Sequence, residues 1–232
     1  DENLKEIQIP VNVPDSGLYQ ISFDYYPIKS KMNPIERGIK INGKYPYFES
    51  RRIVFDRKWK NKSETFPHDE KGNEYPPDSE EVLEWQNTYA MDASYFEDEP
   101  LLYFLNEGEN TISLEFLSDP MLLGDMTISS PKQAKTYEDY KAELPAASKA
   151  KDTIEIEAEH LSNKNIPYIQ PIASEDPGVT PFKVEKRLLN TLGTQGDQTN
   201  QLGGQKITWD FNVKETGFYR LSFKYLQDKK VN

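Results

Sequence analysis

Aromatic rings next to amide and carboxylate side chains are the groups in this sequence that could hold a ligand. Trp59 follows a strand-like stretch in FDRKWKN, and Trp85 lies in the acidic segment EVLEWQN. Tyr75 lies close to Asn73 in KGNEYPP. Flat rings can cover the apolar faces of a saccharide while amides and carboxylates bond its hydroxyl groups. We therefore predict a ligand-binding set on loops: Trp59, Trp85, Tyr75 and Asn73.

Packing inside the fold is the alternative role for two of the tryptophans. If the segment that starts at Ser79 is helical, Trp85 shares an inward-facing stripe with Val82. Trp209 alternates in phase with Ile207 and is predicted to be a core residue.

Catalytic patterns are not found in the sequence. The two histidines, His68 and His160, stand in the unrelated contexts FPHDE and EAEHL. The chain has no nucleophile elbow, phosphate loop, dinucleotide fingerprint or zinc-protease motif. A glycosidase needs a positioned pair of carboxylates, and nothing among the 39 acidic residues marks one. We therefore predict a protein that is not an enzyme and has no catalytic residues.

The charge of the chain limits its partners. The net charge is -11, and no Lys or Arg lies between Lys71 and Lys132, where 14 acidic residues occur. Such a surface repels phosphate, so we expect no nucleic acid partner and no attraction to anionic lipid. A neutral saccharide or a cation is the easier partner. The absence of cysteine excludes disulfides and thiolate metal sites.

Membrane contact is expected only through parts of a longer protein. The chain begins with Asp1 rather than Met, which favours a processed protein or a piece of a longer one. No apolar run approaches the roughly 20 residues that span a bilayer.

The elements that position these residues include one hairpin that occurs twice. IQIPVNVPDSGLYQISFDY starts at Ile7 and ITWDFNVKETGFYRLSFKY starts at Ile207, with 8 of 19 positions identical. Both copies alternate apolar and polar residues on either side of a short turn that ends in glycine. Each copy predicts a β-hairpin, and the spacing of 200 residues indicates tandem modules.

Strand-like segments fill most of the remaining chain, so we predict an all-β fold of antiparallel jelly-roll sandwiches. Helix is expected near residues 79–90 and 133–144 alone. The small-residue stretch PAASKAK predicts a linker with a boundary near residue 148, before a new strand in TIEIEAE. The predicted organisation is a first module that lacks its first strands, a helical linker, and the N-terminal part of a second module. Their ranges are 1–130, 131–152 and 153–232.

Together these segments resemble a known group of domains. IEIEAEH followed by ITWDFNVKETGFYRLSFKY is similar to the start of a galactose-binding-like β-sandwich, as found in carbohydrate-binding modules of families six and thirty-five. VPDSGLYQISFDY, IKINGK, LNEGENTISLEFL and GDMTI resemble the rest of such a module. A longer pattern is similar to domains appended to the extracellular solute-binding proteins of Gram-positive ABC sugar importers. It comprises NPIERGIKINGKYPYFESRRIVFDRKWKN and LNTLGTQGDQTNQLGGQKITWDFNV.

The resemblance implies a function and a metal site. It implies a non-catalytic carbohydrate-binding accessory module of an extracellular, cell-surface sugar-capture system. A structural spacer or protein-interaction sandwich is the alternative. It also implies a structural Ca²⁺ held by Glu157, Glu159 and Asp125, because Ca²⁺ prefers carboxylate oxygens; ordinary edge-strand carboxylates are the alternative.

A sandwich that lacks its first strand exposes an open sheet edge. We therefore predict that residues 153–159 pair with the sheet of the first module. The pairing occurs either within one chain or by strand swapping in a homo-oligomer.

Overall fold

The computed structural model describes residues 5–29, 33–132, 134–144, 152–173, 187–189 and 204–225. The chain divides into two compact units. Unit 1 comprises Asp1–Trp59, Glu81–Lys132 and Leu202–Gly204, and unit 2 comprises Lys60–Glu80, Gln133–Gln201 and Gln205–Asn232. The predicted boundary near residue 148 lies outside the described residues, and the three predicted module ranges stay predictions.

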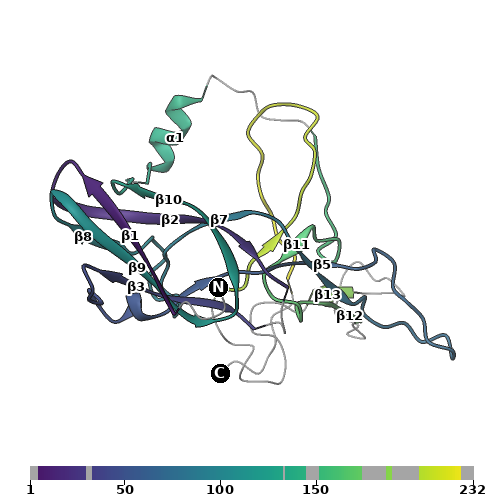
Figure 1. Cartoon of the computed structure of the whole chain (residues 1–232). Coiled ribbons are helices and arrows are strands. Elements are labelled where there is room, and N and C mark those ends of the chain that lie inside the picture. Colours follow the sequence, from purple (N-terminus) through teal and green to yellow (C-terminus); the bar gives the residue numbers. More distant parts are fainter. Residues whose placement is uncertain are drawn as a thin grey trace, which may run out of the picture. The chain divides into compact units, whose positions relative to one another are not determined.

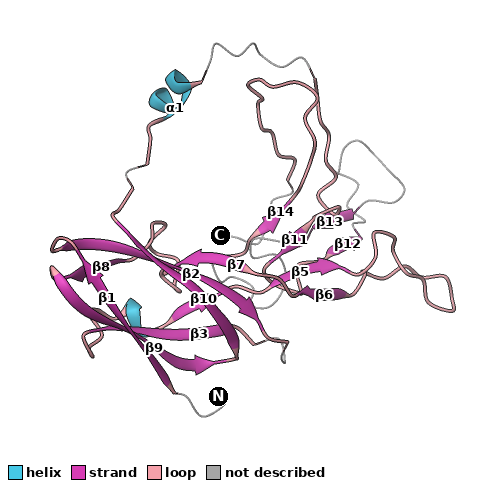
Figure 2. Ribbon diagram, turned by 45° about the horizontal axis from the view of Figure 1, so that its top comes forward, coloured by secondary structure: helices cyan, strands magenta, loops and turns pink. Residues whose placement is uncertain are grey.

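Unit 1 contains two four-stranded antiparallel sheets (Figures 1 and 2). Sheet A has the order β1-β9-β3-β4, formed by Glu6–Val13, Gly108–Ser118, Ile35–Ile41 and Ile53–Phe55. In sheet B the long strand β2 (Gly17–Pro27) pairs with β10 (Met121–Ser129) on one side. On its other side β2 pairs with β7 (Gln86–Tyr89) and β8 (Leu102–Leu105). The predicted all-β antiparallel sandwich is confirmed.

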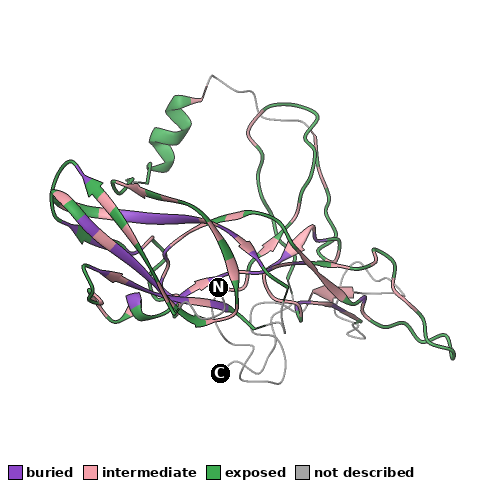
Figure 3. Cartoon of the chain, viewed as in Figure 1, coloured by how far each residue is buried: buried purple, intermediate pink, exposed green. Residues whose placement is uncertain are grey.

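The core of unit 1 follows from the alternation along β2. Ile21, Phe23 and Tyr25 are buried, and the rings of Phe23 and Tyr25 lie 5.6 and 5.1 Å from that of Phe55 on β4 in edge-to-face geometry. Figure 3 shows the buried residues of unit 1 on the strands of both sheets. Burial of each such side chain stabilises the fold by roughly 1.5–3 kcal/mol. The side chains between them on β2 face away from this core.

The turns of unit 1 use the residues that the sequence places there. Asn42 and Gly43 have φ values of 50° and 80°, and the flanking Ile41 and Lys44 exchange backbone hydrogen bonds of 2.8 and 3.0 Å. This geometry favours the Asn-Gly pair because both positions need positive φ.

Unit 2 carries short elements. A sheet of order β14-β11-β5-β6 is formed by Ile207–Thr208, Asn163–Lys164, Lys58–Asn61 and Ser79–Val82, with β5 and β6 crossing the unit boundaries. A two-stranded sheet joins β12 (Pro171–Ala173) to β13 (Arg187–Leu189). Helix α1 (Tyr137–Glu143) begins at Thr136, whose hydroxyl accepts the backbone N–H of Asp139 at 3.2 Å. The helix predicted near residues 133–144 is therefore confirmed, and none of its residues is buried.

Two predicted elements are wrong. Residues 79–90 form β6 and β7 rather than a helix, because Glu80 and Glu81 pair with cations on β5 and just before it. Lys60 lies 2.9 Å from Glu80, and Arg57 lies 2.5 Å from Glu81. Tertiary pairing of this kind routinely overrides helix propensity.

Residues 152–157 form no strand, so the predicted ladder between 153–159 and unit 1 is also wrong within this chain. A carboxylate-rich segment becomes a strand only when a neighbouring strand satisfies its backbone groups. Strand swapping in a homo-oligomer stays a prediction. Within the described ranges, no helix is long and apolar enough to cross a membrane.

Candidate ligand-binding surface

The structure distributes the four predicted binding residues over both units. Tyr75 and Asn73 lie in an exposed loop of unit 2, where the Asn73 amide donates to the carboxylate of Asp69 at 2.8 Å. This bond, with the Asn73 backbone N–H, lowers the pKa of Asp69. The amide of Asn73 therefore stabilises the turn that starts at Asp69.

Trp59 does not offer an open ring. The side chain lies on β5 and is 6% exposed, so the expectation of a loop-surface residue is wrong. The alternation of β5 turns Trp59 inward while the neighbouring lysines turn outward.

Trp209, predicted to be core, is only partly buried, and its ring N–H donates to the carbonyl of Ala158 at 3.0 Å. The core prediction is wrong because the alternating face of this segment is not covered along its length.

Trp85 is the predicted residue that does form an exposed aromatic surface. It lies between β6 and β7 and is 56% exposed. Its ring meets that of Tyr26 edge-to-face, with centroids 5.7 Å apart. A Cβ added at Gly124 would stand 2.9 Å from Trp85 Cζ3 and 3.1 Å from the Cβ of Asp24. The indole therefore rests on the bare backbone of β10 and keeps more than half of its surface in solvent.

Polar groups lie beside the ring on the same outer face of sheet B. Asp24 stands opposite Asn87 in the ladder, and the Asn87 amide donates to Asp24 Oδ1 at 2.7 Å. Tyr26 stands opposite Leu122, which is exposed. We call these residues, with Trp85 and Gly124, the Trp85 surface. On the outer face of one sheet, this surface combines the ring of Trp85, the exposed apolar side chain of Leu122 and the hydrogen-bonded pair of Asp24 and Asn87.

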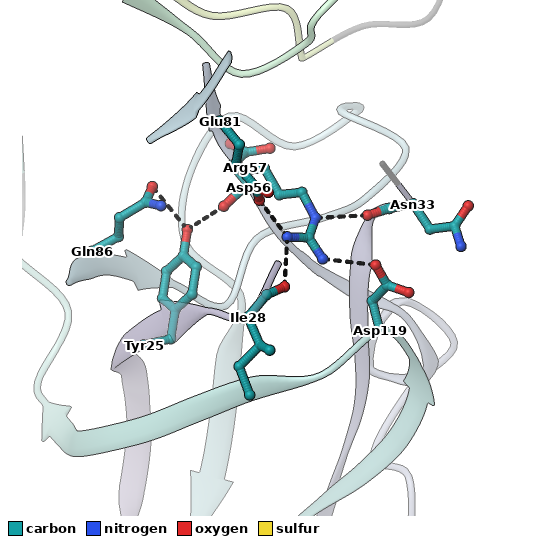
Figure 4. Close-up of polar contacts among 8 residues, drawn as sticks. All are labelled: Tyr25, Ile28, Asn33, Asp56, Arg57, Glu81, Gln86 and Asp119. Carbon is teal, nitrogen blue, oxygen red and sulfur yellow. Dashed lines mark hydrogen bonds and ion pairs between the residues drawn. The ribbon is translucent and has the colours of Figure 1, made fainter. Parts of the chain in front are cut away.

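A buried arginine holds the ends of the strands that carry this surface (Figure 4). The Arg57 guanidinium donates to the carbonyls of Ile28 and Asn33 at 3.1 and 2.9 Å. It also pairs with Glu81 at 2.5 Å and with Asp119 at 2.7 Å. Ile28 follows Tyr26 on the chain, Asp119 precedes β10, and Glu81 precedes Trp85. One cation thus anchors three segments, and replacing it would remove an ion pair from each of two nearly buried carboxylates.

Tyr25 holds the segment that follows Trp85 in place (Figure 4). Its hydroxyl donates to the Asp56 carbonyl at 2.8 Å and lies 3.3 Å from Oε1 of Gln86, the residue after Trp85. Burial raises the pKa of Tyr25, because the phenolate would lose its hydration. The hydroxyl therefore stays protonated and keeps its role as a donor. Glu81 and Gln86 fix both ends of the segment that presents the indole.

The three predicted calcium ligands belong to different units. Asp125 is exposed in the irregular part of β10 in unit 1, whereas Glu157 and Glu159 lie in unit 2. Across the described parts of the chain, no three His, Asp or Glu side chains form a group that could hold a metal ion. The calcium site stays a prediction.

Sequence reasoning missed most of the Trp85 surface. Asp24 and Tyr26 alternate with the buried residues of β2, so their outward direction could have been read from the hairpin pattern. Asn87 stands opposite Asp24 in the ladder and Gly124 lies beside Asp24 in the irregular part of β10, although they are 63 and 100 residues away in the sequence. No local pattern marks either position.

Comparison with known proteins adds one distant structural likeness. No family model matches the chain, and the search of curated proteins found no match. Among solved structures, a family 35 carbohydrate-binding module from Clostridium thermocellum matches with 15% identity and a TM-score of 0.28. The match covers 51% of this chain and 62% of that chain, which is less than two thirds of its length. A likeness of this size carries no argument about function. The class that the fold itself defines is an antiparallel β-sandwich.

Proposed function

We propose that unit 1 is a non-catalytic carbohydrate-binding module that binds a neutral saccharide on the Trp85 surface. The observation that supports the proposal is the half-exposed indole of Trp85, held against Gly124 and Tyr26 beside the Asp24–Asn87 pair. The ring covers the apolar C–H face of a sugar, and the acid–amide pair bonds its hydroxyls.

The choice of a neutral ligand follows from charge. Asp24 belongs to the surface, and the chain as a whole carries a net charge of -11. An anionic ligand would be repelled, whereas a neutral one gains hydrogen bonds to a carboxylate, which are stronger than those between neutral groups.

Glycan-array screening followed by calorimetric titration of the best binder tests the proposal. Trp85→Ala removes the stacking ring and is expected to weaken binding by about tenfold to a hundredfold, the size of a central aromatic contact. Gly124→Ala displaces the ring without deleting it and is expected to weaken binding in the same direction. Phe48→Ala is the matched control, because Phe48 is an exposed ring beside the short 3₁₀ helix Glu49–Arg51. Wild-type affinity in both Trp85→Ala and Gly124→Ala would refute the proposal.

We also propose that the module serves an extracellular, cell-surface sugar-capture system of the ABC-importer kind. The support is the resemblance of the segments NPIERGIKINGKYPYFESRRIVFDRKWKN and LNTLGTQGDQTNQLGGQKITWDFNV to domains of that setting. Protease treatment of intact cells, followed by detection with an antibody against this chain, tests the location. Full protection in intact cells and cleavage after lysis would contradict it.

A further inference from the structure

The outer face of sheet B has a second apolar patch at the other end of β2. Leu18 stands directly opposite Phe104 in the β2–β8 ladder, and Leu102 stands opposite Gln20. Their neighbours Tyr103 and Leu105 are buried, so Leu18, Leu102 and Phe104 face away from the core. Leu18 and Phe104 are each about half exposed.

Leu18 of this apolar patch lies on β2, the strand that also contributes Asp24 and Tyr26 to the Trp85 surface, but the two ends of the strand are far apart. Leu18 and Tyr26 are eight residues apart on β2, which corresponds to about 26 Å at the usual rise of a strand. A single sugar ring cannot bridge this length. The outward residues of β2 between them are polar, but Gln20 and Ser22 are buried and Asp24 is partly buried. Their ladder partners on β10 bring polar groups to the surface here: Thr127, opposite Ser22, is exposed, and Ser129, opposite Gln20, is partly exposed.

Resting on the proposed function, we propose that the ligand is a linear neutral oligosaccharide that runs along β2. Its one end stacks on Trp85, and its other end covers Leu18 and Phe104. The accessible polar side chains of Asp24, Thr127 and Ser129 lie between two apolar contacts, an order that matches a chain of sugar rings with hydroxyl edges. A protein partner that used the face as a whole would meet a polar middle that needs matching groups.

Titration with neutral oligosaccharides of increasing length tests the inference on the whole chain. The probes are cello-, manno-, malto- and galacto-oligosaccharides of one to six units, measured against wild type, Trp85→Ala and Phe104→Ala. Wild-type affinity is expected to rise with length within the series that binds. Phe104→Ala is expected to weaken hexasaccharide binding by about tenfold while short ligands bind as before. Trp85→Ala weakens binding at every length.

The outcomes separate the two proposals. If Trp85→Ala weakens binding but affinity neither rises with length nor responds to Phe104→Ala, the oligosaccharide inference is overturned and the proposed function stands. If Trp85→Ala binds every length like wild type, the proposed function is overturned. If no probe binds to wild type, both are rejected. Sedimentation of the same variants tests whether a second copy of the chain binds to the apolar patch instead. If wild type is a dimer and Phe104→Ala is not, the patch is assigned to that second copy and the inference is overturned.

Discussion

Residues 7–25 and 207–225 repeat one sequence pattern but differ in burial. In the first copy Phe23 and Tyr25 are 0% and 1% exposed, whereas their counterparts Phe223 and Tyr225 are 75% and 80% exposed. These two rings of the first copy lie in the core of a sandwich, whereas their counterparts in the second copy face solvent. Alternation therefore specifies which side chains share a face, and partner strands decide whether that face is buried.

The two copies agree where structure is local. The Tyr19 hydroxyl donates to the carbonyl of Asp15 at 2.7 Å, and the Tyr219 hydroxyl donates to that of Glu215 at the same distance. Both bonds link a tyrosine to the turn four residues earlier. A contact within five residues needs no distant partner and forms in both settings.

They differ where structure is long-range. In the first copy β1 pairs with β9, and β2 pairs with β10, β7 and β8. In the second copy, over the described residues 204–225, the only strand is β14, which pairs with β11. The second hairpin has the sequence of a sandwich edge without the ladder that completes one.

Truncation of the matched phenylalanines gives the largest expected contrast. Phe23→Ala should lower the free energy of unfolding by roughly 3–5 kcal/mol, as for a buried aromatic ring. Phe223→Ala should change it by no more than about 0.5 kcal/mol, because the ring is exposed. Urea denaturation followed by tryptophan fluorescence measures both. Equal losses in the two variants would show that the second copy is buried in solution.

Loss of the arginine that anchors the end of the first hairpin comes next. Arg57→Met removes the partner of Glu81 and Asp119 and should destabilise unit 1 by about 3 kcal/mol. Arg52→Met is the control, because Arg52 pairs with Glu36 but is largely exposed. The same urea titration compares them, and a loss in Arg57→Met no larger than in Arg52→Met would contradict the anchoring role.

The free energy of unfolding of the part of the chain that contains the β11–β14 ladder should increase with pH. Lys164, opposite Ile207 in this ladder, is buried, and burial lowers its pKa to about 8. Between pH 8 and the unfolded value near 10.5, the unfolded state binds more protons, so stability rises with pH. The expected gain in that window is on the order of 1 kcal/mol. Thermal unfolding of wild type should show it relative to Lys164→Met; parallel pH profiles for the two proteins would refute the burial of the ammonium group.

The smallest expected effect is the one that both copies share. Tyr19→Phe and Tyr219→Phe each remove a hydroxyl bond to a nearby turn carbonyl and should each cost about 0.5–1 kcal/mol of local stability. Amide hydrogen exchange in the two turns, which reports the free energy of local opening, provides the measurement. Perturbation of the first turn alone would mean that even this bond depends on the surrounding sandwich.

Much of unit 1 could be predicted from the sequence. Alternation predicts β1 and β2, and strand-like segments predict most of the strands that follow. Prediction failed at residues 79–90, where acidic residues typical of a helix start instead pair with Arg57 and Lys60. It failed again at residues 153–159, where an alternating segment forms no strand.

The proposed binding surface could also be predicted only in part from the sequence. Trp85 was a candidate because an aromatic ring stood in a polar segment, but Trp59 fitted the same description and is buried. Trp59 lies on β5 with its side chain buried, whereas Trp85 lies between β6 and β7 and rests against Gly124 of β10. Neither difference is visible in the flanking residues.

The sequence by itself determined the β character of the chain, the side of each strand that is apolar, the turn positions and the acidic charge, because these depend on residues within a few positions of one another. Only the tertiary structure decided which of two similar hairpins is buried and that Gly124 leaves room for the ring of Trp85. It alone decided that Arg57 joins segments far apart in the chain. Such properties depend on strand pairing across long separations, and a pairing is stable only when every backbone group and buried charge finds its partner.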